Sequence, residues 1–295
     1  MSAAPELREA GERTEAPFGR RAVPVLANAT LGAYRVIRVR DEAGAGAPPR
    51  PGQFYMLATA SGWGGGRDER PFLPRAFSVL RSRPAPAGDA LEHEFLLEDV
   101  GPGTARLAEL VFGEELWLTG PLGRGFAAPD ADRAATALLV GGGVGIAPLA
   151  IWQDELQAAG ADVRALLGFR DAAHAAGAAL LADPRVATDD GSVGQPGLVT
   201  ELLEAALAAA PTGAARPPTI YACGPPPMLE AVRRICVARG VPAQLALEAP
   251  MACGFGACYG CVVPTADGGY KRVCVDGPVF AATELAAVPS AGHDG

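Results

Sequence analysis

The sequence has no excess of positive charge. Its 295 residues include 25 lysines and arginines against 33 aspartates and glutamates, which gives a formal net charge of -8 and an isoelectric point of about 5.0. General electrostatics does not hold so acidic a chain on nucleic acid or on an anionic membrane surface. We therefore expect neither partner.

The sequence also shows no apolar leader. Its first twenty residues, MSAAPELREAGERTEAPFGR, are charged and contain no hydrophobic segment of a secretory signal. One uncharged run, residues 135–152, has four glycines and a proline near its middle. A buried strand, a glycine turn and a helix start explain this run better than a membrane span does. We expect a cytoplasmic protein.

Histidine is scarce. The three histidines, His93, His174 and His293, belong to no hydrolytic triad or metalloprotease pattern. We expect all three at the surface, and we assign no catalytic side chain.

Hydrophobic residues make up 49% of the chain, enough for two packed domains and a small appendage. Short apolar runs punctuated by Gly and Pro predict an antiparallel β-barrel at 22–130. Alternating strand and helix patterns predict a doubly wound parallel α/β domain at 131–245. A small Gly- and Cys-rich domain follows at 246–283. Residues 1–21 and 284–295 are expected to be tails.

Individual elements can be placed within these regions. In the barrel, strands are expected at 33–40, 54–60, 76–80, 93–100 and 115–123, with a short helix at 104–111 that Thr104 could cap. In the α/β domain, strands are expected at 136–143, 162–170 and 218–224, and helices at 147–160, 199–210 and 225–240.

Four of the six cysteines lie within 22 residues. Their spacing is C-x4-C-x2-C-x12-C, formed by Cys253, Cys258, Cys261 and Cys274. The first three have the spacing of plant-type ferredoxins, which hold a [2Fe-2S] cluster. The glycines between them allow backbone N–H groups to approach the cluster sulfides. Short strands at 261–265 and 270–275 would carry the chain out and back, so that the fourth cysteine closes the site.

A structural zinc site is the alternative interpretation, because zinc also accepts four thiolates. Zinc sites usually combine two C-x2-C pairs, and only Cys258 and Cys261 form one here. The spacing therefore favours the cluster. A disulfide framework is not expected in a large cytoplasmic protein.

A glycine turn, GGGVGIAP at 141–148, follows a predicted strand and precedes a predicted helix. This context suits a dinucleotide pyrophosphate at a helix N-terminus. The turn reads G-x-G-x-x-P, however, and a purely structural tight turn remains open. A second wall of the same crevice is expected at the end of the strand at 218–224. The candidate nucleotide-binding residues are Gly141, Gly142, Gly143, Gly145, Cys223, Gly224 and Pro225.

Several motifs, taken together and in this order, resemble those of a known protein family. They are RAFSVL (75–80), GPGT (101–104), GPLGRGF (120–126), GGGVGIAP, YACGPPPM (221–228), MACGFGACYGC (251–261) and KRVCVDGPVF (271–280). From about residue 25 to about 282, the chain resembles the ferredoxin-NADP reductase superfamily. More narrowly, it is similar to the electron-transfer subunits of class 1B dihydroorotate dehydrogenases.

The resemblance implies FAD on the β domain, NAD on the α/β domain and a [2Fe-2S] cluster on the C-terminal domain. Arg75 would bind the FAD pyrophosphate, Ser78 and Phe77 would lie by the flavin ring, and Gly103 would bind phosphate with Thr104. Glu98 departs from the family pattern, and we expect it to use its backbone or to reach the ribose. The implied FAD residues are Arg75, Ala76, Phe77, Ser78, Leu96, Leu97, Glu98, Gly103 and Thr104.

The implied function is an electron relay in pyrimidine (UMP) biosynthesis. Electrons would pass from dihydroorotate to FMN on a partner catalytic subunit, then through the cluster and FAD to NAD+, in a heterotetramer with two copies of each subunit. One alternative is the small subunit of a ferredoxin:NADP reductase, sulfide dehydrogenase or hydrogenase. Another alternative is a non-catalytic nucleotide-binding protein whose four cysteines hold a structural zinc ion. GFRD at 168–171 offers both an arginine and an acid near the ribose, so the sequence does not separate NAD from NADP.

Overall fold

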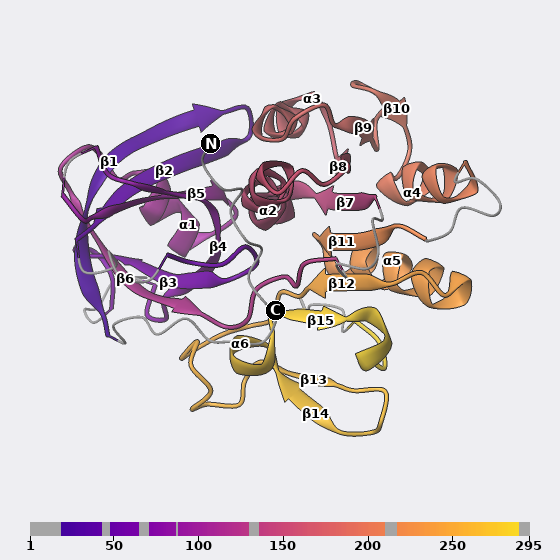
Figure 1. The fold of residues 1–295 in the computed structure, drawn as a ribbon. Coiled ribbons are helices and arrows are strands. Elements are labelled where there is room, and N and C mark those ends of the chain that lie inside the picture. Colours follow the sequence, from indigo (N-terminus) through magenta and orange to yellow (C-terminus); the bar gives the residue numbers. More distant parts are fainter. Residues whose placement is uncertain are drawn as a thin grey trace.

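The computed structural model describes residues 19–42, 48–64, 71–86, 88–129, 136–209 and 217–288. Three parts are visible in Figure 1: a barrel, an α/β layer beside it, and a small C-terminal part beneath both. The predicted fold class is confirmed. The boundary expected at 130 and both chain ends fall on or next to residues outside the described ranges.

The barrel is closed by six antiparallel strands in the order β1-β2-β5-β4-β3-β6. The strands are β1 (Arg21–Leu31), β2 (Tyr34–Asp41), β3 (Phe54–Thr59), β4 (Arg75–Pro84), β5 (Leu91–Glu98) and β6 (Glu115–Leu122). The sequence pattern missed β1. Its residues, RAVPVLANATL, contain a proline and an asparagine and do not alternate cleanly, and pairing with β2 and β6 makes them a strand.

The short helix of the barrel is α1 (Pro102–Ala108). It begins and ends earlier than the predicted 104–111, because Pro102 suits the first helical turn. Thr104 is not the N-cap residue. It lies three residues inside the helix, and its hydroxyl accepts hydrogen bonds from the N–H groups of Val100 and Gly101.

A buried polar network lies in the barrel, and it corrects the surface assignment of His93. His93 and Asp41 are fully buried. Arg21 donates to both carboxylate oxygens of Asp41, with Nε at 2.8 Å from Oδ1. His93 lies 3.5 Å from the same carboxylate and 3.1 Å from the hydroxyl of Ser82. Buried polar groups need such partners, so each member holds the next in place.

The α/β sheet has seven strands in the order β10-β9-β8-β7-β11-β12-β15. All are parallel except β15 (Val279–Ala281). The parallel strands are β7 (Ala137–Gly142), β8 (Val163–Phe169), β9 (Arg185–Thr188), β10 (Gln195–Pro196), β11 (Thr219–Cys223) and β12 (Ala243–Ala246). The three long ones match the predicted strands. β9, β10 and β12, at two to four residues, are too short to show a sequence period.

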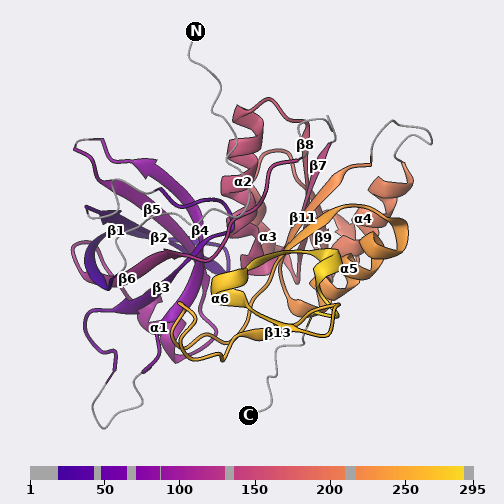
Figure 2. The same cartoon turned by 60° about the horizontal axis from the view of Figure 1, so that its bottom comes forward.

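Helices cover both faces of this sheet (Figure 2). They are η1 (Gly143–Ile146), α2 (Ala147–Ala158), α3 (Ala172–Ala175), η2 (Ala176–Leu180), α4 (Val199–Ala208) and α5 (Pro226–Arg239). Successive residues of β7 show the two faces. Leu138 and Val140 pack in the core with α4 and α5, whereas Ala137 and Leu139 pack in the core with α2.

The C-terminal part contains β13 (Val262–Pro264), β14 (Tyr270–Arg272), α6 (Val273–Asp276), β15 and η3 (Ala282–Glu284). The strand expected at 270–275 ends at Arg272, so Cys274 lies on a short helix instead of on a strand. β15 pairs antiparallel with β12 and extends the α/β sheet.

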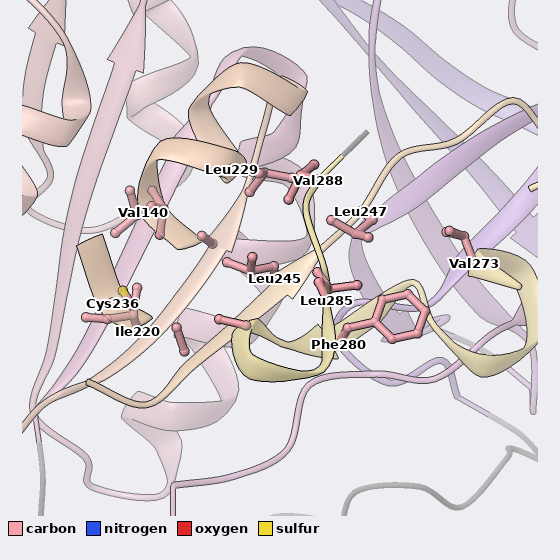
Figure 3. Close-up of a cluster of buried hydrophobic side chains, with 14 of the residues drawn as sticks. Val140, Ile220, Leu229, Cys236, Leu245, Leu247, Val273, Phe280, Leu285 and Val288 are labelled. Atoms are coloured by element: carbon pink, nitrogen blue, oxygen red, sulfur yellow. The ribbon is translucent and has the colours of Figure 1, made fainter. Parts of the chain in front are cut away.

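Packing in this part continues beyond the boundary expected at 283. Figure 3 shows Leu285 and Val288 in one buried cluster with Leu229 of α5 and Leu245 of β12. The N–H of Val288 donates to Glu230 at 2.9 Å. The cluster also includes Met56 and Leu122 of the barrel, so a single core joins all three parts.

Among the helices in the described ranges, none is both long and apolar enough to cross a membrane. Residues 135–152, apart from the undescribed residue 135, contain β7, the glycine turn and the first half of α2, as the sequence predicts.

We predict that the barrel loses stability in acid through Asp41. Burial alone would raise the pKa of Asp41, but hydrogen bonds from Arg21 and His93 hold it below its ordinary value of 3.8. The unfolded chain therefore takes up the proton first. The stabilisation is complete above about pH 4 and is lost as the pH falls. Asp41→Asn should lower the free energy of unfolding at pH 7 by about 3 kcal/mol and flatten its acid dependence.

Denaturant unfolding between pH 3 and pH 7 measures both effects. Asp154→Asn is the control, because Asp154 is half exposed in its ion pair with Arg81 and should contribute about 0–1 kcal/mol. Equal losses in the two variants would contradict the assignment.

Candidate functional site

A cavity of about 830 Å³ opens at the carboxyl ends of β7, β8 and β11. Ligands of open α/β sheets bind at this edge. Five of the predicted nucleotide-binding residues line it together: Gly142, Gly143, Gly145, Gly224 and Pro225. The two walls expected from the sequence therefore meet at one cavity.

The two walls approach each other so closely that Gly145 has no room for a side chain. A Cβ at this position would lie 2.5 Å from the N of Gly224 and 2.6 Å from the carbonyl of Cys223. These are backbone atoms at the end of β11, so they cannot shift without disturbing the strand. Glycine at this position is thus needed for the approach of the two loops.

Two predicted residues do not line the cavity. Gly141 is buried, and a Cβ there would lie 3.0 Å from Ile146, Leu149 and Leu167. Cys223 is 3% exposed, and burial, with the charge of Glu248, raises the pKa of its thiol well above the ordinary value. Both residues pack behind the cavity wall.

Several lining residues were not among the predicted site residues. Tyr34 comes from the barrel, and Arg170, His174, Asp189 and Glu248 come from the α/β side. His174 is not a surface residue, since its side chain is 13% exposed and lies against Tyr34. GFRD at the end of a predicted strand was the available signal for Arg170. No sequence spacing announces Tyr34, which reaches the cavity only through the docking of the barrel.

Glu98 turns its side chain toward this cavity wall. Its carboxylate accepts a hydrogen bond from Arg170 and lies 3.1 Å from Nε2 of His174. The predicted contact between Glu98 and a cofactor stays a prediction.

Strands β4 and β5 carry the two flavin motifs, and they diverge at one end. Their pairing runs only as far as Val79 opposite Phe95. Beyond that pair, residues 75–78 are bonded to β3 and residues 96–98 to β2. The backbone edges that face each other across this gap are therefore free to meet a ligand.

Arg75 and the start of α1 close the same gap. A Cβ on Gly103 would lie 2.7 Å from Nε of Arg75, so glycine lets the arginine lie across the helix start. Arg75 also donates to the carbonyl of Leu73 at 2.6 Å. An arginine beside backbone N–H groups suits an anionic pyrophosphate, and the residues present thus fit FAD.

The remaining flavin candidates differ in exposure. Leu96 is buried in the core with α2, and Leu97 is buried in the barrel core, so both can reach a cofactor only through their backbone. Ala76 is exposed, whereas Phe77 and Ser78 are half-buried. The Thr104 hydroxyl already bonds its own loop, which leaves its backbone for a phosphate.

The four candidate cluster ligands lie in two close pairs. The sulfurs of Cys261 and Cys274 are 3.2 Å apart and buried. Cys253 and Cys258 are hydrogen-bonded to each other nearer the surface. Within the described ranges, no three His, Cys, Asp or Glu side chains form a metal-binding group, so the four-cysteine site stays a prediction.

The chemistry of these cysteines nevertheless suits a cluster. All four are free thiols. Burial of Cys253 opposes its ionisation, but the backbone N–H groups of Phe255 and Cys258 outweigh burial and lower its pKa below the ordinary 9.0. Burial, together with Cys261, raises the pKa of Cys274. Thiolate ligands with backbone N–H donors around them are what an iron–sulfur cluster requires.

The cysteine loop packs directly on the barrel. Gly254, with φ +78°, is so close to β3 that a Cβ would lie 2.6 Å from Cγ of Met56 and 3.2 Å from Leu122. Met56 is paired in register with Ala76, the second residue of RAFS. One strand therefore separates the cysteine loop from the flavin motif.

Comparison with known proteins identifies the family. Residues 248–286 match the iron-sulfur cluster binding domain of dihydroorotate dehydrogenase B. The electron transfer subunit of dihydroorotate dehydrogenase B (NAD(+)) from Geobacillus thermodenitrificans (strain NG80-2) is 42% identical over 245 residues, 80% of this chain and 86% of that protein. The subunit from Bacillus caldolyticus is 42% identical over 246 residues, with the same coverage. The chain belongs to this family.

Solved structures of ferredoxin reductases share the fold of this chain. An NADH-dependent reduced ferredoxin-NADP oxidoreductase, studied for flavin-based electron bifurcation, superimposes with a TM-score of 0.72 at 25% identity and covers 89% of each chain. A ferredoxin NADP+ reductase from Neisseria gonorrhoeae with bound FAD and NADP, at 19% identity, has a TM-score of 0.53 and covers 75% of this chain and 92% of that one, and shows the fold. The family expected from the sequence is confirmed.

We predict that Gly145→Ala weakens dinucleotide binding. The added methyl group would push the two cavity walls apart, and overpacking of this kind costs about 1–3 kcal/mol. The KM for NADH in dye reduction should rise about tenfold or more. The visible absorption spectrum of the bound flavin and cluster should keep its shape. Gly19→Ala is the control, because open space surrounds that position. An unchanged KM in Gly145→Ala would remove this turn from the binding site.

Proposed function

We propose that the chain relays electrons from dihydroorotate oxidation to NAD+ in pyrimidine biosynthesis. The oxidation takes place at FMN on a partner catalytic subunit, and two copies of each subunit form a heterotetramer. Electrons enter this chain at a [2Fe-2S] cluster, pass to FAD and leave on NAD+. Family membership supports this function, because the relatives are named as the electron transfer subunits of an NAD(+)-linked dihydroorotate dehydrogenase.

The placement of the cysteine loop carries the proposal. Gly254, between two of the cysteines, touches Met56 of β3, and Met56 is the registered neighbour of Ala76 in the flavin motif. Adjacent strands lie only about 5 Å apart. A cluster on this loop is therefore one strand from the flavin, which an electron relay needs and a structural zinc site does not.

Each cofactor has a place that fits it. Cys253, Cys258, Cys261 and Cys274 would hold the cluster. Arg75 with the start of α1, and the diverging edges of β4 and β5, would hold FAD. When bound, the flavin supplies the exchange between one-electron transfer at the cluster and hydride transfer at the nicotinamide. The side chains bind and orient these groups, and no acid or base is assigned.

The cavity at the sheet edge would take NAD. Gly142, Gly143 and Gly145 present backbone at the start of η1 and α2, which suits a pyrophosphate. Gly224 and Pro225 form the opposite wall.

We also place the protein in the cytoplasm. The six cysteines are free thiols, and four of them are offered as cluster ligands. Thiols of this kind persist in a reducing compartment.

The decisive experiment combines the chain with an FMN-containing dihydroorotate dehydrogenase catalytic subunit. The complex should reduce NAD+ when given dihydroorotate. The isolated, reconstituted chain should reduce dyes with NADH but should not oxidise dihydroorotate. A colourless protein that contains zinc and no flavin would overturn the proposal, and NADPH-linked reduction of ferredoxin would favour a ferredoxin:NADP reductase role.

We predict that Cys258→Ser abolishes the cluster and interrupts the relay. Cys258 is exposed, so its replacement should not disturb a core. The visible absorbance and the electron paramagnetic resonance signal of the cluster should be lost. Dihydroorotate-dependent NAD+ reduction should be lost as well, whereas NADH-driven dye reduction through FAD should remain. Cys236→Ala is the control, because Cys236 is a buried core residue of α5 and should leave the cluster signal intact. A normal cluster spectrum in Cys258→Ser would exclude it as a ligand.

A further inference from the structure

A charged network forms the cavity wall where the barrel meets the α/β domain. It joins Glu98 at the end of β5 to Arg170, Asp171 and His174, which follow β8. Nη2 of Arg170 donates to the carboxylate of Glu98 and lies 2.6 Å from Nε2 of His174. One side chain of the barrel thus bonds an arginine of the α/β domain.

The hydrogen bonds around His174 determine how the arginine is held. Oδ1 of Asp171 lies 2.7 Å from Nδ1 of His174 and also accepts from the backbone N–H of His174 at 3.0 Å. We therefore assign the ring proton to Nδ1, which leaves Nε2 as an acceptor. Both hydrogens of Nη2 of Arg170 are then used, one by Glu98 and one by His174.

Packing fixes this arrangement. The ring of Tyr34 meets His174 edge-on, with ring centroids 5.6 Å apart. The N–H of Ala33 donates to the carbonyl of Ala173 at 3.0 Å, where the β1–β2 turn contacts α3. Arg170 itself is 63% exposed, and an ion pair so exposed adds little to folding stability. The network therefore affects ligand binding by Arg170 more than it affects folding stability.

Arg170 occupies a position that matters for dinucleotide choice. It directly follows β8, the strand beside β7, and β7 leads into the glycine turn. At this place in dinucleotide-binding sheets, an acid meets the ribose 2′-hydroxyl of NAD, and an arginine accommodates the 2′-phosphate of NADP. A guanidinium recognises phosphate by offering paired N–H groups.

The charges around Arg170 oppose a 2′-phosphate. Of the described residues that line the cavity, Arg170 is the one permanent cation, against the carboxyl groups of Glu98, Asp189 and Glu248. A phosphate that approached Nη2 would have to displace the Glu98 carboxylate and would meet it as a like charge.

We propose that Glu98 is a positioning residue that makes the chain select NAD over NADP, by withholding Arg170 from the 2′-phosphate. This inference rests on the proposed function, in which the cavity binds the dinucleotide. The selectivity comes from the barrel side of the domain boundary, so the specificity of the nucleotide domain depends on how the two domains dock.

Glu98→Gln tests the inference, because it removes the charge and keeps the shape. Calorimetric titration of the FAD- and cluster-loaded chain with 5′-ADP and 2′,5′-ADP isolates the contribution of the 2′-phosphate. The affinity for 2′,5′-ADP should rise about tenfold to a hundredfold, the effect of a hydrogen bond to a charged group, while that for 5′-ADP stays within about twofold. In dye reduction, the KM for NADPH should fall and kcat should change little.

Companion variants separate this role from a structural one. Glu98→Ser should show the same gain, and Glu98→Gln combined with Arg170→Ala should return to the preference of the natural chain. Glu92→Gln is the matched control, since Glu92 lies on the same strand, accepts from Arg40 at 3.0 Å and does not line the cavity. It should leave both titrations unchanged.

Normal use of NADH by both Glu98 variants without any gain for 2′,5′-ADP or NADPH would overturn the inference. A gain that survives the removal of Arg170 would overturn it as well. A natural chain that binds neither 5′-ADP nor NADH would instead overturn the proposed nucleotide site, and the two failures are therefore distinguishable.

Discussion

The pairing of β15 with β12 is the constraint on which the rest of the structure depends. Leu245 faces Phe280 and Ala246 faces Val279 in this short antiparallel ladder. Immediately before it, Pro278 forms a bridge with Arg124, which follows the last barrel strand. A few residues of backbone thus fasten the C-terminal part to the α/β sheet and to the barrel at once. The cysteine loop, between β12 and β15 in the sequence, is thereby brought onto β3.

The cavity and the cysteine loop both lie at boundaries between parts. The cavity takes Tyr34 and Glu98 from the barrel and its glycine turn from the α/β sheet. The gap between β4 and β5 opens where the barrel strands leave each other. Electron transfer between cofactors requires short separations, and a boundary lets each domain keep an intact core while its ligand-binding edge faces the next domain.

The sequence was informative wherever chemistry demands a fixed spacing or a buried period. Cys253, Cys258 and Cys261 signal a cluster because the ligand geometry dictates the intervals. The run from Ala137 to Gly145 signals a strand and turn because both faces of β7 are buried. It failed where tertiary contact decides. β1 is a strand because it pairs with neighbouring strands. His93 can be buried because Asp41 and Ser82 provide polar partners for its ring. Glu98 bonds Arg170, which belongs to a different part of the fold.

The position of β15 has a consequence for the protein before its C-terminal part is in place. β12 would then be the last strand of a parallel sheet, with the backbone of Gln244–Ala246 open on one side. An uncovered strand edge is a template for association with other chains. The segment that delivers Cys274 is followed at once by the strand that covers this edge. If Cys274 is a cluster ligand, as proposed, then cluster assembly and protection of this edge against association depend on the same stretch of polypeptide.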